Sequence, residues 1–182
     1  YLGCRLVRRL LDAGHAVRVF DRFCFGRAAL SDLEDAPALE IVEGDIRRLQ
    51  EAPGLFTGMD AVAHLACLSN DPSCDLNEQM ARDVNVESTL ELARHAMQHG
   101  IRRFVFSSSC NVYGRGVMDQ VDEQSPVRPA STFGETKREA EEALLGMRSG
   151  SFEPVIARTA SLFGWSPRMR FDLAVNQMVA RA

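Results

Sequence analysis

Hydroxyl groups, a phenylalanine and a lysine form the part of the sequence with the clearest chemical meaning. Residues 107–109 of "SSSCNVYG" are three serines at the end of an apolar run, and "STFGETK" places Phe133 four residues before Lys137. A hydroxyl at a strand end and a lysine on a neighbouring helix can bracket a carbinol or carbonyl. The hydroxyl donates to the oxygen, while the lysine fixes a ribose and lowers a neighbouring pKa. Serines are also common in turns, so the run by itself equally fits a plain loop.

A second group of residues has the spacing of a dinucleotide site. Gly3 opens a helix and Asp21 follows eighteen residues later at the end of a strand, which fits the rear half of a fingerprint that binds pyrophosphate at a helix N-terminus. A carboxylate at position 21 would accept hydrogen bonds from a ribose diol and repel a 2′-phosphate, so NAD is favoured over NADP. Arg22 weakens this preference, and a chance helix before an acidic strand end would have the same pattern.

Two further strand ends carry polar residues. The segments "GDI" (44–46) and "HLA" (64–66) each close an apolar run, at the edge where open α/β sheets bind ligands. Asp45 could contact an adenine or cap a helix, and the two roles are compatible. His64 by itself is more typical of a structural histidine than of a catalytic one.

Strands that alternate with helices must position these groups. Apolar residues between positions 2 and 11 recur at helical spacing and stop before Gly14, which can cap the helix in a left-handed conformation. We further expect strands at 16–20, 39–45, 60–66, 102–109 and 154–164 (the last with a loop), a short helix at 46–52, and long helices at about 75–99 and 131–147. This alternation indicates an α/β fold with a doubly wound parallel sheet. Because such a sheet ordinarily begins with a strand, one is expected upstream of Tyr1.

Composition limits the kinds of partner. The chain has 182 residues, enough for one sizeable core, and its 21 basic and 25 acidic residues are interspersed with a net charge of -4, which indicates no nucleic-acid partner. Five scattered cysteines without a CxxC pair favour reduced thiols and indicate no metal site. No apolar run reaches the roughly 20 residues that span a bilayer, and no signal peptide is visible. We therefore expect a cytoplasmic protein without a membrane partner.

Taken in order, these segments resemble the extended short-chain dehydrogenase/reductase family, in particular its NAD-dependent nucleotide-sugar epimerase/dehydratase branch. The matching segments are "YLG", "VFD", "GDI", "HLA", "DVNVESTLELARHA", "FVFSSSCNVYG", "FGETK" and "ARTASLFGWSPRMRFD". The resemblance implies a Rossmann-type domain over residues 1–164, without its first strand, and the start of a substrate-binding part over 165–182, most of which would follow residue 182. It also implies a nucleotide-sugar substrate and a homodimer formed through the two long helices.

The resemblance also assigns roles to individual residues. It implies an NAD site made of Gly3, Asp21, Arg22, Asp45, Ile46, His64, Leu65, Ala66, Asn85 and Lys137. It implies substrate contacts from Ser109, Cys110, Asn111, Ser161, Arg168 and Arg170, although the two arginines also fit a solvated cationic loop. Dehydratases of this branch carry an Asp-Glu pair after the reactive hydroxyl. Here Cys110 and Asn111 stand at those positions, which argues against dehydration.

The catalytic positions implied by the resemblance are Ser109, Phe133 and Lys137, and one of them lacks its usual group. In the epimerases a tyrosine phenolate removes the hydroxyl proton, and Phe133 stands in its place. Loss of general acid/base catalysis typically costs about 10²- to 10⁴-fold in rate. Two hypotheses follow: an NAD-dependent nucleotide-sugar epimerase whose activity is impaired or altered by Phe133, or a catalytically inactive dinucleotide-binding relative that serves as a binding or regulatory module.

Overall fold

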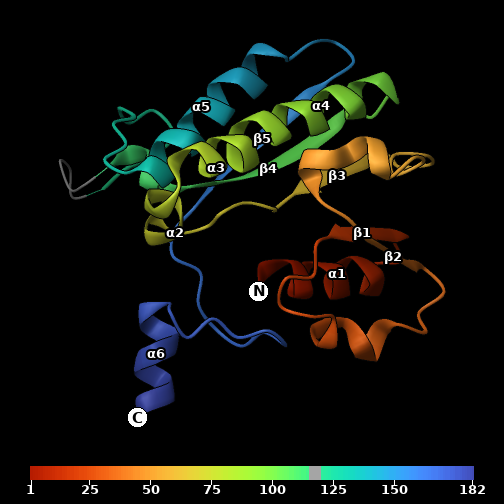
Figure 1. The fold of residues 1–182 in the computed structure, drawn as a ribbon, viewed down its shortest axis with the longest axis horizontal. Coiled ribbons are helices and arrows are strands. Elements are labelled where there is room, and N and C mark those ends of the chain that lie inside the picture. The colour runs from red at the N-terminus through yellow and green to blue at the C-terminus, as the bar shows by residue number, and fades with distance from the viewer. Residues whose placement is uncertain (115–119) are drawn as a thin grey trace. The chain divides into compact units, whose positions relative to one another are not determined.

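The computed structural model shows an α/β protein in which strands β1 to β5 pair in parallel, which confirms the predicted fold class (Figure 1). It describes residues 1–114 and 120–182. The chain forms two compact units, Tyr1–Leu55 with Ser161–Ala182, and Phe56–Ala160. Among the described residues, no helix is both long and apolar enough to cross a bilayer. The division into domains at residues 1–164 and 165–182 remains a prediction.

The first unit is built on two parallel strands. The elements are α1 (Leu2–Asp12), β1 (Val17–Asp21), η1 (Ala28–Leu33), β2 (Leu39–Glu43), η2 (Ile46–Glu51) and, near the C-terminus, α6 (Ala174–Arg181). The register aligns Asp21 at the end of β1 with Glu43 at the end of β2. The predicted left-handed glycine after α1 is confirmed, because Gly14 has a φ of 82°. The C-terminal ends of β1 and β2 therefore carry their acidic residues at one edge.

The second unit holds a three-stranded parallel sheet in the order β3-β4-β5. Its elements are β3 (Ala61–His64), α2 (Asp71–Leu76), α3 (Glu78–Arg82), η3 (Asp83–Glu87), α4 (Ser88–Gln98), β4 (Arg103–Ser109), η4 (Cys110–Tyr113), α5 (Thr132–Gly146) and β5 (Glu153–Thr159). Helix α5 packs against β4, β5 and α4, as Figure 1 shows. Phe104, Phe106 and Phe152 are fully buried between these elements and form the centre of the core.

The single helix predicted over about 75–99 is wrong. The chain instead begins α2 at Asp71, breaks at Asn77, and passes through the π-helical turn η3 before α4. Asn77 has an extended backbone (φ −157°, ψ 91°), and its side chain accepts a hydrogen bond of 2.9 Å from the Met80 amide. This is an N-cap, which lets a helix restart after an extended residue. The π turn then directs Asn85 into the protein, where it is fully buried.

Four short elements had no counterpart in the sequence-based expectation. They are η1, the start of α2, η4 and α6. Each has at most eight residues, and helices this short depend on tertiary contacts more than on their own propensity. Periodicity alone therefore carries little signal for them.

A buried ion pair joins α5 to the strands of the second unit. The Glu141 carboxylate, 2% exposed, accepts hydrogen bonds from the Arg158 guanidinium at 2.7–3.1 Å and from the Ser108 hydroxyl. Arg158 also donates to the Tyr113 hydroxyl at 3.1 Å, and hydrogen bonding to Glu141 raises the pKa of Arg158. Four elements, α5, β4, β5 and η4, are thus joined through this ion pair.

A buried histidine links β3 to α4. The His64 Nε2 lies 2.8 Å from the Thr89 hydroxyl, which itself donates to the Asn85 carbonyl at 2.8 Å. Because that hydroxyl proton is used, His64 must carry its own proton on Nε2 and donate it to Thr89. The pKa of His64 falls to about 3, mainly because of burial and to a smaller extent because of the charge of Lys137. The ring is therefore neutral in the folded protein at neutral pH.

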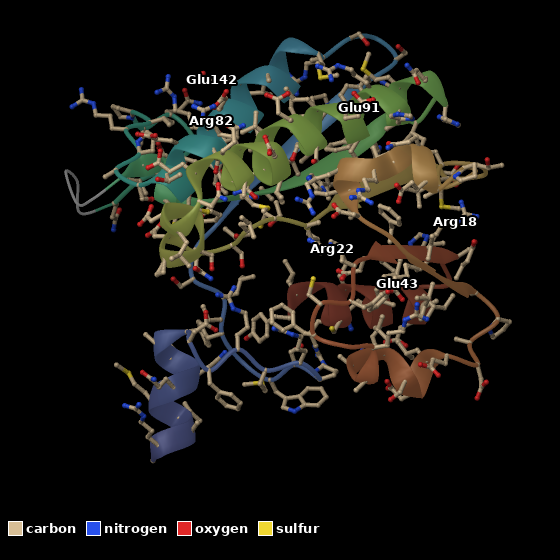
Figure 2. All side chains as sticks on the ribbon, viewed as in Figure 1. Arg18, Arg22, Glu43, Arg82, Glu91 and Glu142 are labelled. Atoms are coloured by element: carbon tan, nitrogen blue, oxygen red, sulfur yellow. The ribbon has the colours of Figure 1, made fainter. Side chains whose placement is uncertain are left out.

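Glu141→Gln is expected to destabilise the protein by about 3 kcal/mol, because it leaves the Arg158 cation without a counter-charge inside the fold. Urea unfolding monitored by circular dichroism measures the change in the free energy of unfolding. The matched control is Glu142→Gln, labelled in Figure 2, which removes the same charge from an exposed pair with Arg138 and should change stability little. Equal effects of the two substitutions would contradict the role given to Glu141.

His64 should make stability depend on pH below neutrality. Its pKa is about 3 when folded against an ordinary 6.5, so below pH 6.5 the unfolded chain takes up a proton that the folded protein rejects. Lowering the pH from 7.5 to 5 should therefore remove about 2 kcal/mol of unfolding free energy through this residue alone. Urea titrations at both pH values should show a correspondingly smaller loss in His64→Gln. The same pH dependence in parent and variant would rule this account out.

Candidate active site

The three consecutive serines at the end of β4 have three different environments. Strand alternation turns Ser108 inward to Glu141, while Ser107 and Ser109 face the other side. The Ser107 carbonyl accepts a hydrogen bond of 2.8 Å from the Lys137 ammonium. Ser109 ends the strand and caps η4, where its hydroxyl oxygen accepts from the Asn111 amide at 3.2 Å. The run is thus a strand end rather than a loop, and Ser109 is the serine at its tip.

Lys137 is a buried cation with few partners. It is 2% exposed, and its ammonium lies 4.6 Å from the centroid of the Phe106 ring and 5.8 Å from that of Phe133. Within the described part of the chain, Lys137 donates a single hydrogen bond, to Ser107. An ammonium group has three N–H donors. The arrangement therefore suits a ligand that brings further acceptors, such as the hydroxyls of a ribose.

Phe133 lies in the first turn of α5, one turn before Lys137. Its ring is 7% exposed and packs in an apolar cluster with Cys74 and Ala81, beside Cys67 and Leu68. The ring has no ionisable atom, so the structure provides no acid or base at this position. Lys137 lies near this aromatic ring, but the ring has no hydroxyl group whose pKa the lysine could lower.

The first turn of α5 approaches η4 closely. Ser131 caps the helix by accepting from the Gly134 amide at 3.2 Å. A Cβ atom on Gly134 would lie 2.7 Å from the Asn111 carbonyl oxygen, so only glycine fits without a shift. This contact and the Lys137–Ser107 hydrogen bond fix the start of α5 against the end of β4. The structure thereby gathers Ser109, Cys110, Asn111, Phe133 and Lys137 in one region of the second unit.

Asn85 is held by the protein on every side of its amide. Its Oδ1 accepts from the Leu68 amide at 2.8 Å, and its Nδ2 donates to the Leu68 carbonyl and to the Thr136 hydroxyl, each at 3.1 Å. It thus ties the segment after β3 to α5. The His64 side chain is likewise hydrogen-bonded within the protein. Its neighbours Leu65 and Ala66 are only partly buried, whereas His64 is buried. The cofactor-binding roles of these residues remain predictions.

In the first unit, the predicted residues lie at the C-terminal ends of β1 and β2. The Asp21 Oδ1 accepts a hydrogen bond of 2.7 Å from the Phe23 amide, an Asx turn that fixes the carboxylate. Phe23 has a φ of 50°, which is unusual for a residue with a side chain. Gly3 lies in the first turn of α1. A carboxylate held in place at a strand end fits the diol of an adenosine ribose.

Asp45 is the most heavily engaged carboxylate of this unit. It caps η2 by accepting from the Arg47 amide at 3.0 Å, and the Arg47 guanidinium donates to both of its oxygens at 2.6–3.1 Å. The Arg22 guanidinium lies 3.3 Å away on the same carboxylate. The hydrogen bond from Arg47 is the main reason that the pKa of Asp45 falls to about 2. The predicted cap is thus confirmed, whereas the adenine contact of Asp45 remains a prediction; Ile46 beside it is buried.

The arginines predicted to meet a diphosphate already have partners. Arg168 stacks 3.6 Å from the centroid of the exposed Phe25 ring, and Arg170 pairs with Asp172. Ser161 is exposed at the start of the same segment. These three residues belong to the first unit, whereas Ser109, Cys110 and Asn111 belong to the second. The predicted substrate set is therefore divided between the units, and its roles remain predictions.

Several residues that shape the site escaped the sequence-based analysis. They are Cys74, Thr89, Thr136, Glu141 and Arg158. The positions of Glu141 and Arg158 could have been noticed in the sequence. Glu141 follows Lys137 by four residues on the helix, and Arg158 interrupts the apolar run of "PVIARTA". A charge on an apolar strand requires a buried partner.

Comparison with known proteins places this geometry in a family. The model of the NAD-dependent epimerase/dehydratase family matches residues 1–182. A 3-beta-hydroxysteroid dehydrogenase of Mycolicibacterium neoaurum is 32% identical over 154 residues, which are 80% of this chain and 40% of that protein. A UDP-glucose 4-epimerase of Halalkalibacterium halodurans is 33% identical over 140 residues, 75% of this chain and 40% of that protein.

Solved structures agree with this placement. The UDP-Glc/GlcNAc 4-epimerase of Campylobacter jejuni superposes with a TM-score of 0.81 at 29% identity, over 87% of this chain and 50% of that one. The chain thus spans about half of that structure and 40% of the two relatives above. The parallel α/β fold and NAD as the cofactor class agree with the expectations drawn from the motifs. On these grounds, the chain belongs to the NAD-dependent epimerase/dehydratase family.

Proposed function

We propose that the protein carrying this chain is an NAD-dependent, nucleotide-sugar epimerase-like oxidoreductase that acts at a sugar carbinol, with activity lowered by Phe133. The observation that carries the proposal is the buried, sparsely bonded Lys137, whose ammonium donates to the Ser107 carbonyl two residues before Ser109 at the tip of β4. A buried ammonium with a single hydrogen bond is costly to keep without a ligand. A chain that served only as a scaffold would be more stable with an apolar residue in place of Lys137.

Each residue has a defined task in this proposal. Gly3, Asp21 and Asp45 would hold the pyrophosphate and adenosine of NAD, and Lys137 would donate to the hydroxyls of the nicotinamide ribose. When bound, NAD supplies the hydride acceptor and donor for the sugar carbon. The Ser109 hydroxyl would donate to the reacting sugar oxygen and hold it in place. Cys110 and Asn111 offer no carboxylates at the positions where dehydratases carry an acidic pair, which favours epimerisation over loss of water.

The missing phenol limits the rate in this proposal. With Phe133 in the acid/base position, the sugar hydroxyl must lose its proton to solvent or to a weaker group, and the loss of general base catalysis costs about 10²- to 10⁴-fold. Among the described residues, the neighbours of the ring in this cluster are Cys67, Leu68, Cys74 and Ala81, none of which carries a phenol or a carboxylate. The same observation favours the second candidate function, a dinucleotide-binding module without catalysis.

Assembly and location belong to the proposal as well. We propose a homodimer that forms through α4 and α5, whose outer surfaces carry ion pairs such as Glu91–Arg94 and Arg138–Glu142 beside the exposed side chains of Met97 and Leu145. Figure 2 shows Glu91 and Glu142 on these two helices. All five cysteines have free thiols, which supports a cytoplasmic location, since reducing compartments keep thiols free.

Phe133→Tyr is expected to raise kcat/KM for nucleotide-sugar epimerisation by about 10²- to 10⁴-fold, because it restores the phenol one turn before Lys137. The full-length protein should be assayed with NAD and a panel of UDP-, dTDP- and GDP-sugars, with a 3β-hydroxysteroid as the alternative carbinol. The matched control is Phe133→Tyr combined with Lys137→Met, which should lose the gain because nothing lowers the pKa of the new phenol.

The outcomes separate the two candidate functions. A parent that binds NAD in calorimetry, with a Phe133→Tyr variant inactive on every sugar, would overturn the epimerase proposal in favour of the binding module. Turnover of the steroid alone would replace the substrate class but keep the carbinol chemistry. A parent that binds no NAD would overturn both candidates.

A further inference from the structure

Four charged side chains belong to the segments where β1 and β2 end. They are two carboxylates, Asp21 and Asp45, and two guanidinium groups, Arg22 and Arg47. Figure 2 labels Arg22 after β1 and Glu43 at the end of β2. The inference drawn from this cluster rests on the proposed binding of NAD, and it concerns how the site would distinguish NAD from NADP.

The sequence alone gives contradictory signals about this choice. NADP differs from NAD by a phosphate on the adenosine 2′-oxygen. A carboxylate at the end of the strand favours the free diol, whereas an arginine nearby favours the phosphate. The chain carries both, Asp21 followed directly by Arg22. A guanidinium with open donors pairs readily and bidentately with phosphate oxygens, so the state of Arg22 decides the outcome.

The structure shows what engages Arg22. Its Nε lies 3.3 Å from Oδ2 of Asp45, an oxygen that also receives the Arg47 guanidinium. The Asp45 side chain is only 15% exposed, whereas that of Arg22 is 53% exposed. Asp45 is also the N-cap of η2, where its side chain accepts a hydrogen bond from the Arg47 amide. The carboxylate is therefore the more buried partner of this ion pair, and the arginine is the more exposed one.

Asp45 keeps its charge throughout the useful pH range. Its pKa is about 2, mainly because of the hydrogen bond from Arg47 and against the effect of partial burial. The anion that retains Arg22 is thus present whenever the protein is folded and active. To bind Arg22, a 2′-phosphate would have to replace the Asp45 carboxylate as its partner. It would also come close to the Asp21 carboxylate, which has the same sign of charge.

We propose that Asp45 is a specificity-determining residue that acts through Arg22: by pairing with its guanidinium, Asp45 withholds Arg22 from a 2′-phosphate, so that the site takes NAD and rejects NADP. The role is one of positioning and charge balance. It is separate from any contact that Asp45 makes with adenine, since an adenine contact would strengthen both dinucleotides alike.

The ratio of two dissociation constants isolates this role. Titration calorimetry of the full-length protein with NAD⁺ and with NADP⁺ gives Kd for each. Asp45→Asn keeps a good helix cap and nearly the same shape but removes the charge. We expect it to shift the ratio of the two Kd values toward NADP⁺ by about tenfold, because it removes the ion pair that Arg22 makes with Asp45.

Two matched variants test the cause. Glu43→Gln removes the same charge at the end of β2, where it pairs with Arg27 on the surface, and should leave the ratio unchanged. In an Arg22→Gln background, Asp45→Asn should no longer shift the ratio, because the arginine that it frees is absent.

Each result either supports or overturns the inference. A tenfold shift that is confined to Asp45→Asn and is lost with Arg22→Gln supports it. A parent that binds NAD⁺, with a ratio that Asp45→Asn leaves unchanged, overturns it while the proposed function stands. An equal shift from Glu43→Gln, or a shift that survives in the Arg22→Gln background, also overturns it, because general charge or Arg47 would then be the cause. A parent that binds neither dinucleotide overturns the proposed function and the inference together.

Discussion

The ion pair between Glu141 and Arg158 is the interaction on which the second unit depends. Burying two charges is costly, and the cost is offset only when the pair is close and its remaining hydrogen-bonding groups are satisfied. Both conditions hold, since Arg158 contacts both oxygens of Glu141 and Ser108 completes the set. The pair fixes α5 along the sheet. The position of Lys137, one turn earlier on the same helix, follows from it.

The regular elements could be predicted from the sequence because each has a strong local signal. Strands β1 to β5 are short apolar runs with polar ends, and Gly14 and Gly100 end their helices in left-handed conformations. The break at Asn77 and the π turn at 83–87 could not be predicted, because the apolar spacing there still fits one helix. Their cause is tertiary, since Asn85 must reach Leu68 and Thr136.

For the candidate site, too, one part could be predicted from the sequence and another part could not. The motif order predicted the candidate residues, because strand ends and the spacing on α5 are visible in sequence, and their roles remain predictions. It could not show that Asp45 retains Arg22, or that His64 is turned to Thr89, because these partners are separated by 23 and 25 residues along the chain. Side-chain pairing across such separations depends on the packed fold, and single-sequence patterns contain no record of it.

Helix α5 carries Phe133, Lys137 and Glu141 at intervals of four residues, and therefore along one face. The first of these positions concerns chemistry, the last concerns the integrity of the fold, and Lys137 lies between them. Because the anchoring residue is two turns away from position 133, a change at 133 leaves the anchor untouched. Codons for phenylalanine and tyrosine differ at one base. A lineage with this helix could thus lose and regain its acid/base group by a single mutational step, without passing through an unfolded intermediate.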